Sequence, residues 1–199
     1  MNTRFLGILC VIGGLVYLAG GVWLSIAGAP TDPGGIRFAH LFSLIWAVGG
    51  LCGLLGMLIT YATGANRIGR VAIGLPAIGL GLVIIDAGIG LIASNSSSPF
   101  SDPVSPFSAI SRLLLLVGFL VLTILVLRAK RWTGWSRFAP LGVLLAPFVG
   151  LLLGSLLGIE FFQLVVIGLS WALVGLAVQT QQTVTECGSG FCAEGVVSG

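Results

Sequence analysis

Long apolar runs separated by short polar segments extend over most of this chain. A helix needs about 20 predominantly apolar residues to cross a bilayer core about 30 Å thick, and six segments reach or approach that length. These segments are residues 5–27, 39–61, 71–94, 108–127, 138–157 and 161–178. Because only residues 158–160 separate the last two, we expect a tight hairpin between them. The pattern predicts an all-α fold, namely a polytopic integral membrane protein that forms a six-transmembrane-helix bundle.

The composition agrees with this interpretation of the pattern. Of the 199 residues, 57% are hydrophobic and only 8% are charged, whereas an average soluble domain carries about 25% charged residues. The mean hydropathy is +1.14. The 31 glycines also suit membrane helices, in which glycine is more frequent than in soluble helices. We therefore expect residues 1–178 to form one transmembrane domain in contact with the lipid bilayer, and residues 179–199 to form a flexible polar tail.

The first apolar run also resembles a secretory signal peptide, because Arg4 precedes it and Ala27-Gly28-Ala29 follows the pattern of a cleavage site. Its 23 residues exceed the core of a signal peptide, which has about 7 to 15. Pro30 would also follow the cut directly. We expect an uncleaved first helix.

The basic residues predict how the chain is oriented, since short cytoplasmic loops carry an excess of Lys and Arg. With the N-terminus inside, seven basic residues lie on the inner side, and only Arg37 and Arg112 lie on the outer side. The seven are Arg4, Arg67, Arg70, Arg128, Lys130, Arg131 and Arg137. We therefore expect both termini in the cytoplasm and the protein in the plasma (inner) membrane.

Small residues predict where the helices approach one another, because membrane helices associate through close packing at Gly, Ala and Ser. The fifth segment is the clearest case, since a small residue recurs at every fourth position. These residues are Gly142, Ala146, Gly150, Gly154 and Gly158. The fourth segment has few small residues and a leucine-rich run at 113–117, so we expect it on the lipid-facing rim. Trp23, Trp132 and Trp135 are expected in the interfacial belts, where tryptophan is enriched.

Asp86 is the only charged residue deep inside a predicted span. Nine residues separate it from Asn95, or about 13 Å at about 1.5 Å per residue; this places it near the bilayer midplane, where an Asp costs about 2.5–3.5 kcal/mol. Ala72, Gly79 and Gly90 share its helical face, so we expect its side chain to point into the bundle. An intramembrane carboxylate indicates a functional site. The alternative is a protonated Asp that hydrogen-bonds a neighbouring helix and stabilises the packing.

Further ionisable residues gather near the outer ends of the predicted spans. Arg37 and His40 lie at the start of the second span, Arg112 at the start of the fourth, and Glu160 in the final hairpin. The candidates for binding a substrate or an ion are therefore Asp86, His40, Arg112 and Glu160. The alternative for this outer cluster is anchoring at the membrane interface, since long charged side chains near helix ends commonly extend to it.

The sequence offers little for catalysis, metal binding or nucleic-acid binding. No Gly-x-Ser-x-Gly motif occurs and acid–base groups do not cluster, so we lean against an enzyme. The chain has a single histidine, which excludes a histidine-rich metal site. Cys187 and Cys192 lack the further ligands that structural zinc normally takes, and no basic stretch alternates with aromatic residues. We therefore expect neither a metal nor a nucleic acid, and the sequence identifies no cofactor.

Two functions are compatible with these features. The first is a small transporter or permease-like protein, whose polar path passes Asp86 and opens toward the outer cluster. The alternative is a non-catalytic, membrane-embedded subunit that scaffolds a larger complex and binds partner membrane subunits or copies of itself through its glycine-rich helix faces. With six predicted spans in 199 residues, the chain resembles in size and topology the substrate-binding subunits of energy-coupling vitamin importers. That resemblance assigns no residue.

Overall fold

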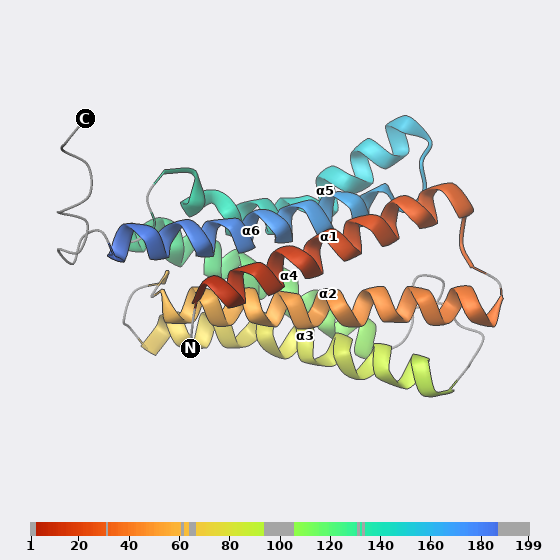
Figure 1. Ribbon diagram of the computed structural model, residues 1–199, viewed down its shortest axis with the longest axis horizontal. Coiled ribbons are helices and arrows are strands. Elements are labelled where there is room, and N and C mark those ends of the chain that lie inside the picture. The colour runs from red at the N-terminus through yellow and green to blue at the C-terminus, as the bar shows by residue number, and fades with distance from the viewer. Residues whose placement is uncertain are drawn as a thin grey trace, which may run out of the picture.

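The computed structural model describes residues 3–30, 32–60, 62–63, 67–93, 106–130, 132 and 134–186. Its helices are α1 (Thr3–Ala27), α2 (Pro33–Ile59), α3 (Arg67–Ala93), α4 (Pro106–Ala129), the short 3-10 helix η1 (Gly134–Phe138), α5 (Ala139–Leu157) and α6 (Phe162–Glu186). No strand occurs within these ranges, and all six α-helices are long and apolar enough to cross a membrane. The predicted all-α, six-helix membrane fold is confirmed (Figure 1).

Several helices extend beyond the predicted spans, because polar residues at a membrane interface can continue a helix that hydropathy alone would end. α2 begins at Pro33 rather than at residue 39, and Asp32 caps it by accepting a 2.8 Å hydrogen bond from the Gly35 N–H. Such a cap satisfies one of the backbone donors that a helix start leaves open. α6 likewise continues to Glu186, eight residues past the predicted span. The rest of the predicted tail, residues 187–199, lies outside the described residues.

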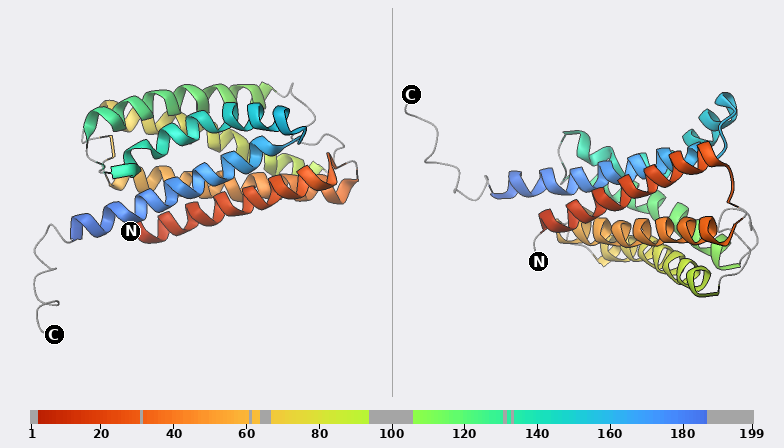
Figure 2. Two further views of the ribbon diagram at one scale, coloured as in Figure 1. Left: turned by 90° about the horizontal axis from the view of Figure 1, so that it is seen from above. Right: turned by 45° about the vertical axis from the view of Figure 1, so that its right-hand side comes forward.

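The six helices form a closed ring, in which each helix packs against its neighbours in the chain and α6 returns to α1. Figure 1 and Figure 2 show α1 and α6 side by side, with the start of α1 and the end of α6 at the same end of the bundle. The opposite end, where α1 ends and α2 begins, is named the outer end, in keeping with the predicted orientation. Within the ring, the contact between α1 and α6 is the most extensive and that between α4 and α5 the least.

Glycines of α1 lie at close contacts with two neighbouring helices. A Cβ atom added to Gly14 would lie 2.6 Å from the carbonyl oxygen of Gly168, and one added to Gly168 would lie 2.6 Å from the carbonyl oxygen of Gly14. On another face of α1, a Cβ at Gly13 would lie 2.9 Å from the Cα of Gly49. Real Cβ atoms essentially never come this close to other atoms. α1 can therefore contact α6 and α2 at backbone distance only because these positions lack side chains.

The predicted small-residue face of α5 is used in part. A Cβ at Gly150 would overlap Gln163 of α6, and one at Gly154 would lie 2.9 Å from the carbonyl oxygen of Ile159. Gly158 ends the helix with a left-handed φ of 66°, a conformation that glycine adopts without steric cost. Gly142, by contrast, is exposed and has only one atom of α6 at 4.0 Å. The close contact thus belongs to the half of α5 next to the hairpin.

The sequence predicts α4 on the lipid-facing rim, and the structure adds that one of its faces packs against α3. Leu113 is 62% exposed, as expected. Leu115, however, packs on α3, where its Cγ would lie 3.0 Å from a Cβ at Gly79. The ring of Pro76 likewise packs against Gly118, and its Cδ would lie 2.5 Å from a Cβ added to Gly118. The leucine-rich run concealed this contact because the small residue at Gly79 lies on the other helix.

Candidate functional site

Asp86 is half-buried on α3, on the outer side of the helix's middle. It lies seven residues before Ala93, or about 10 Å from that helix end at about 1.5 Å per residue. The middle of α3 is at Leu80, so Asp86 lies six residues to the outer side of it. A polar group between a membrane helix's middle and its end is closer to that end of the helix, where polar side chains reach the interface more easily.

The small-residue face that carries Asp86 packs against His40 of α2. The imidazole of His40 is 4% exposed, and a Cβ added to Gly90 would overlap it. Gly90 lies one helical turn from Asp86, since residues four apart share a helix face. Glycine at this position therefore lets α2 and α3 approach at the outer end, and it seats the histidine one turn outward of the carboxylate.

Asp86 faces a cavity of about 380 Å³ that receives side chains from all six helices. One lining residue from each helix, in chain order, is Tyr17, Trp46, Asp86, Arg112, Pro147 and Trp171. Asp86 and Arg112 are the charged residues of this lining, and no ion pair joins them within the part of the chain that the structure describes. The cavity thus holds one carboxylate and one guanidinium that do not neutralise each other directly.

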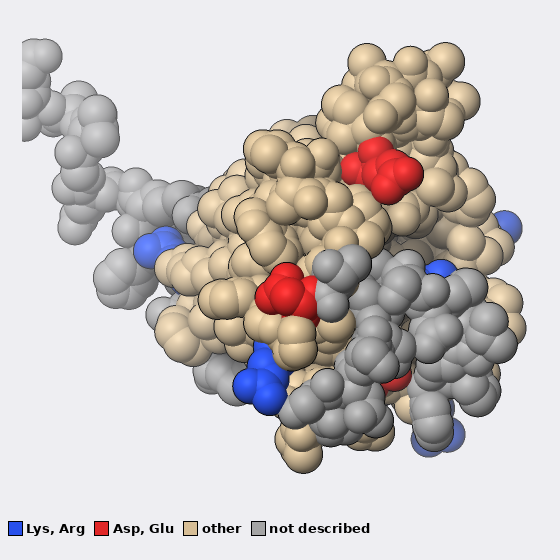
Figure 3. Space-filling model, turned by 90° about the vertical axis from the view of Figure 1, so that its right-hand side faces the viewer, with Lys and Arg blue, Asp and Glu red and all other residues tan. Residues whose placement is uncertain are grey.

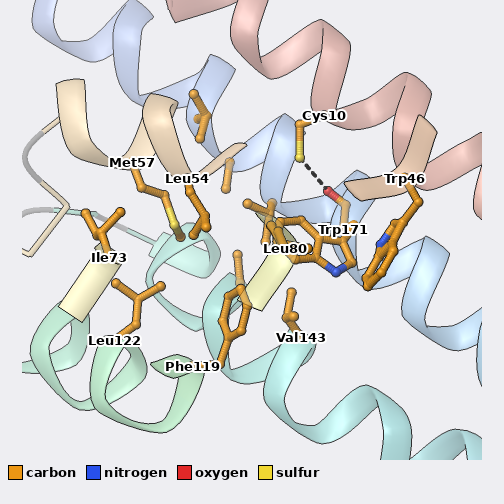
Figure 4. Close-up of a cluster of buried hydrophobic side chains, with 14 of the residues drawn as sticks. Cys10, Trp46, Leu54, Met57, Ile73, Leu80, Phe119, Leu122, Val143 and Trp171 are labelled. Carbon is orange, nitrogen blue, oxygen red and sulfur yellow. Dashed lines mark hydrogen bonds between the residues drawn. The ribbon is translucent and has the colours of Figure 1, made fainter. Parts of the chain in front are cut away.

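Four aromatic rings form one wall of the cavity. Tyr17 stacks on Trp46 with ring centroids 4.7 Å apart, and Trp46 meets Trp171 edge to face at 6.1 Å. Phe119 also meets Trp171 edge to face, at 5.3 Å. Offset stacks and edge-to-face pairs are the favoured aromatic geometries. Figure 4 shows Trp46, Phe119 and Trp171 in this cluster, and also the 3.3 Å hydrogen bond from the Cys10 thiol to the Trp171 carbonyl oxygen.

Polar groups accompany the aromatic wall. Ser43 and Ser111 are buried and line the cavity, as does the half-buried Gln163. The Ser43 hydroxyl donates to the Ala39 carbonyl oxygen at 3.1 Å. The indole N–H of Trp46 has no acceptor among the described residues, although the side chain is only 8% exposed. A buried donor without an acceptor is costly, so this N–H can gain from an acceptor on a bound molecule.

The cavity lies between two pairs of closely packed helices, α3 with α4 and α5 with α6, and small residues allow the close packing within each pair. Gly79 and Gly118 bring α3 and α4 together, and Gly150 brings α5 against α6. No comparable glycine contact joins α4 to α5 among the described residues, and these two helices have the sparsest contact in the ring. Pro147 of α5, which interrupts the helix hydrogen bonds, lines the resulting gap.

The structure brings together only part of the predicted outer cluster. Asp86 and Arg112 share the cavity, and His40 packs one turn away. Glu160 is exposed, and its carbonyl oxygen accepts a 3.0 Å hydrogen bond from Ser25; it lines a separate surface hollow near the hairpin. Figure 3 shows that the described part of the outer end is mostly uncharged, with a few separate acidic and basic groups.

Sequence reasoning missed the aromatic wall, although a signal for it existed. Trp46 and Trp171 lie well inside the apolar spans, whereas interfacial tryptophans lie near the ends. Trp132, for which the sequence predicts a place in an interfacial belt, is also 2% exposed.

No group of His, Cys, Asp or Glu that could hold a metal occurs among the described residues. The chain matches no protein-family model, no curated protein and no solved structure.

Proposed function

We propose that this protein is a small transporter of the permease type, which binds a solute in the cavity between its six helices and carries it across the membrane. The observation that supports this function is the cavity itself, because it receives side chains from every helix and contains Asp86. Ligand sites of small molecules typically occupy about 300–1,000 Å³, and this cavity of about 380 Å³ falls within that range. Polar residues at membrane depth commonly mark substrate pathways.

The two halves of the bundle are packed differently, as transport requires. On the inner side of Trp171 the side chains of Leu54, Met57, Leu122 and Val126 are at most 1% exposed, as in a closely packed core. Figure 4 shows three of these residues grouped on one side of Trp171, with Trp46 on the other side. The bundle is therefore hollow in its outer half and closed in its inner half. Release on the inner side needs this closed half to separate, and the sparse α4–α5 contact is where the helices can move most easily.

The proposed orientation places the hollow half toward the outside of the plasma (inner) membrane, with both termini in the cytoplasm. The basic residues support it, because the described helix ends at Arg67, Arg70, Arg128 and Arg137 lie at the same end of the bundle as the start of α1. Loops that remain in the cytoplasm carry this excess of Arg and Lys.

Uptake into proteoliposomes tests the proposal. Purified protein is reconstituted, and the uptake of radiolabelled amino acids, amines, carboxylates and sugars is compared with uptake by protein-free liposomes. We expect faster uptake of at least one solute. Asp86→Asn should abolish that uptake without lowering the thermal unfolding temperature, because the amide is nearly isosteric but carries no charge.

Asp32→Asn is the matched control for this substitution. It makes the same chemical change at an exposed acid that does not line the cavity, and Asn caps a helix about as well as Asp does. Uptake should therefore be retained. If Asp86→Asn leaves uptake unchanged, the carboxylate has no role in transport, and if no solute is taken up faster than in protein-free liposomes, the transport proposal itself fails.

One observation favours the alternative of a membrane-embedded scaffold. Gly74, Gly81 and Gly88 recur every seventh residue on α3, and a Cβ at any of them would have no neighbour within 4 Å. This is a small-residue face that the bundle leaves unused, and a partner helix or a second copy could pack on it. A companion subunit that co-purifies with the native protein and is lost in Gly81→Leu would support this function.

A further inference from the structure

The two charged residues of the cavity place opposite charges on neighbouring helices. Asp86 belongs to α3 and Arg112 to α4, and both line the cavity, with no ion pair joining the two. A guanidinium is always charged in proteins, and an acid at membrane depth usually needs a partner. A ligand that carries a cationic and an anionic group at separate atoms would satisfy both side chains at once, whereas a simple cation or anion would meet a like charge.

The remainder of the lining selects for an apolar body. Tyr17, Trp46, Phe119 and Trp171 form the aromatic wall, and aliphatic side chains of α5 and α6 such as Val143, Leu144 and Ile167 lie among the other lining residues. The unpaired indole N–H of Trp46 offers a donor to an oxygen of the ligand. A diacyl phospholipid carries both charges, but it is far larger than a cavity of about 380 Å³.

We infer that the cavity binds a small zwitterion with an apolar or aromatic body, of which a hydrophobic α-amino acid is the simplest example. Its ammonium group would lie at Asp86, its carboxylate at Arg112 and its side chain against the aromatic wall. Arg binds carboxylates through two parallel N–H···O bonds, and such charge-assisted bonds are stronger than neutral ones. The inference rests on the proposed function, because it names the ligand of the same cavity.

Three probes that share a phenyl ring and differ in charge test this inference. L-Phenylalanine carries both charges, phenethylamine lacks the carboxylate, and 3-phenylpropanoate lacks the ammonium group. Binding to the purified full-length protein is measured by calorimetry. We expect phenylalanine to bind at least about tenfold more tightly than either single-charge probe, because each of these loses a charge-assisted bond and leaves one protein charge unmatched.

Two variants assign each ligand charge to its side chain. Asp86→Asn should remove the preference for phenylalanine over 3-phenylpropanoate and keep the preference over phenethylamine. Arg112→Gln should remove the preference for phenylalanine over phenethylamine and keep the preference over 3-phenylpropanoate. A merely structural loss would weaken all three probes together, so the crossed pattern identifies direct recognition. Asp32→Asn is again the control and should leave all three affinities unchanged.

The outcomes separate this inference from the function on which it rests. If phenethylamine binds as tightly as phenylalanine to the native protein, or if the crossed pattern is missing, the zwitterion inference is overturned. If none of the three probes binds but proteoliposomes still take up another solute, the inference fails and the transport function stands. If no probe binds and no solute is taken up, both fail.

Discussion

The contact between Gly14 and Gly168 allows a quantitative test of how this bundle is held together. A Cβ at Gly168 would lie 2.5 Å from the backbone nitrogen of Leu18 and 2.6 Å from the Gly14 carbonyl oxygen, whereas ordinary contact begins at 3.4 Å. Gly168→Ala therefore lacks about 0.8–0.9 Å of space against backbone atoms, which cannot rotate away as a side chain can. α1 and α6 must separate by a comparable distance along the most extensive helix contact of the ring.

Gly81→Ala is the matched control, because it makes the same change in the middle of α3 where a Cβ would meet nothing within 4 Å. Both substitutions gain the helix propensity of Ala over Gly, which is at most about 1 kcal/mol, so this gain cancels in the comparison. The remaining difference is overpacking, which typically costs about 1–3 kcal/mol. At about 2–4 °C per kcal/mol for a chain of this size, Gly168→Ala should unfold several degrees below Gly81→Ala.

Thermal unfolding in detergent, followed by tryptophan fluorescence, measures this difference. The double variant Gly14→Ala/Gly168→Ala adds a second test, because each glycine contacts the backbone of the other. Once the Cβ of one alanine has separated the helices, the Cβ of the second alanine costs less stability. The combined destabilisation should be smaller than the sum of the two single effects, as expected for residues in direct contact. Equal unfolding temperatures for Gly168→Ala and Gly81→Ala, or strict additivity in the double variant, would refute the close α1–α6 contact.

Three further predictions address the outer end, the cavity and the orientation. Gly90→Ala should lower the unfolding temperature, because its Cβ overlaps the His40 ring, and His40→Ala should relieve most of that loss; a loss that persists in the double variant would contradict the contact. The cavity can be tested by cysteine labelling in a background without the four native cysteines. Leu144→Cys in the cavity should react with a membrane-impermeant maleimide added outside, whereas the lipid-facing Leu113→Cys should not, since thiols react as hydrated thiolates. Equal labelling of the two variants would argue against an open cavity. A reporter enzyme that works only in the cytoplasm should be active when it is fused after Gly199. A fusion that is active only outside the cytoplasm would contradict the proposed orientation.

The fold was predictable because bilayer thickness fixes how long an apolar run must be, and each of the six runs reaches or approaches that length independently of the others. The glycine contacts were harder to predict from the sequence. The small residues of α5 recur at every fourth position and form a conspicuous pattern, but the most extensive helix contact, between α1 and α6, uses Gly7, Gly14 and Gly21 of α1, which recur at every seventh position. Both spacings return to the same helix face. Which of the two faces meets a partner backbone depends on the arrangement of all six helices.

Part of the candidate site is visible in the sequence for a different reason. Charges are rare in this chain and conspicuous beside its apolar runs, so the sequence alone singles out Asp86 and Arg112. The aromatic wall is not visible in this way, because Trp46 and Trp171 are 125 residues apart in the chain and meet only because α2 and α6 contact each other across the ring. Tryptophan far from the span ends indicates burial, but it does not identify the ring against which it packs.

The environment of Asp86 bears on the choice between a functional and a structural carboxyl group. A structural role requires an interhelical hydrogen bond, since that bond offsets the cost of burying the acid. Asp86 makes no hydrogen bond to another residue in the described part of the chain, and its side chain faces a cavity that also contains Arg112. Among the described residues, the packing therefore supplies no hydrogen bond to this carboxyl group, and water or a ligand can supply one. An acid that depends on the contents of a cavity is placed to sense what enters it, and this favours the substrate-binding role over the structural one.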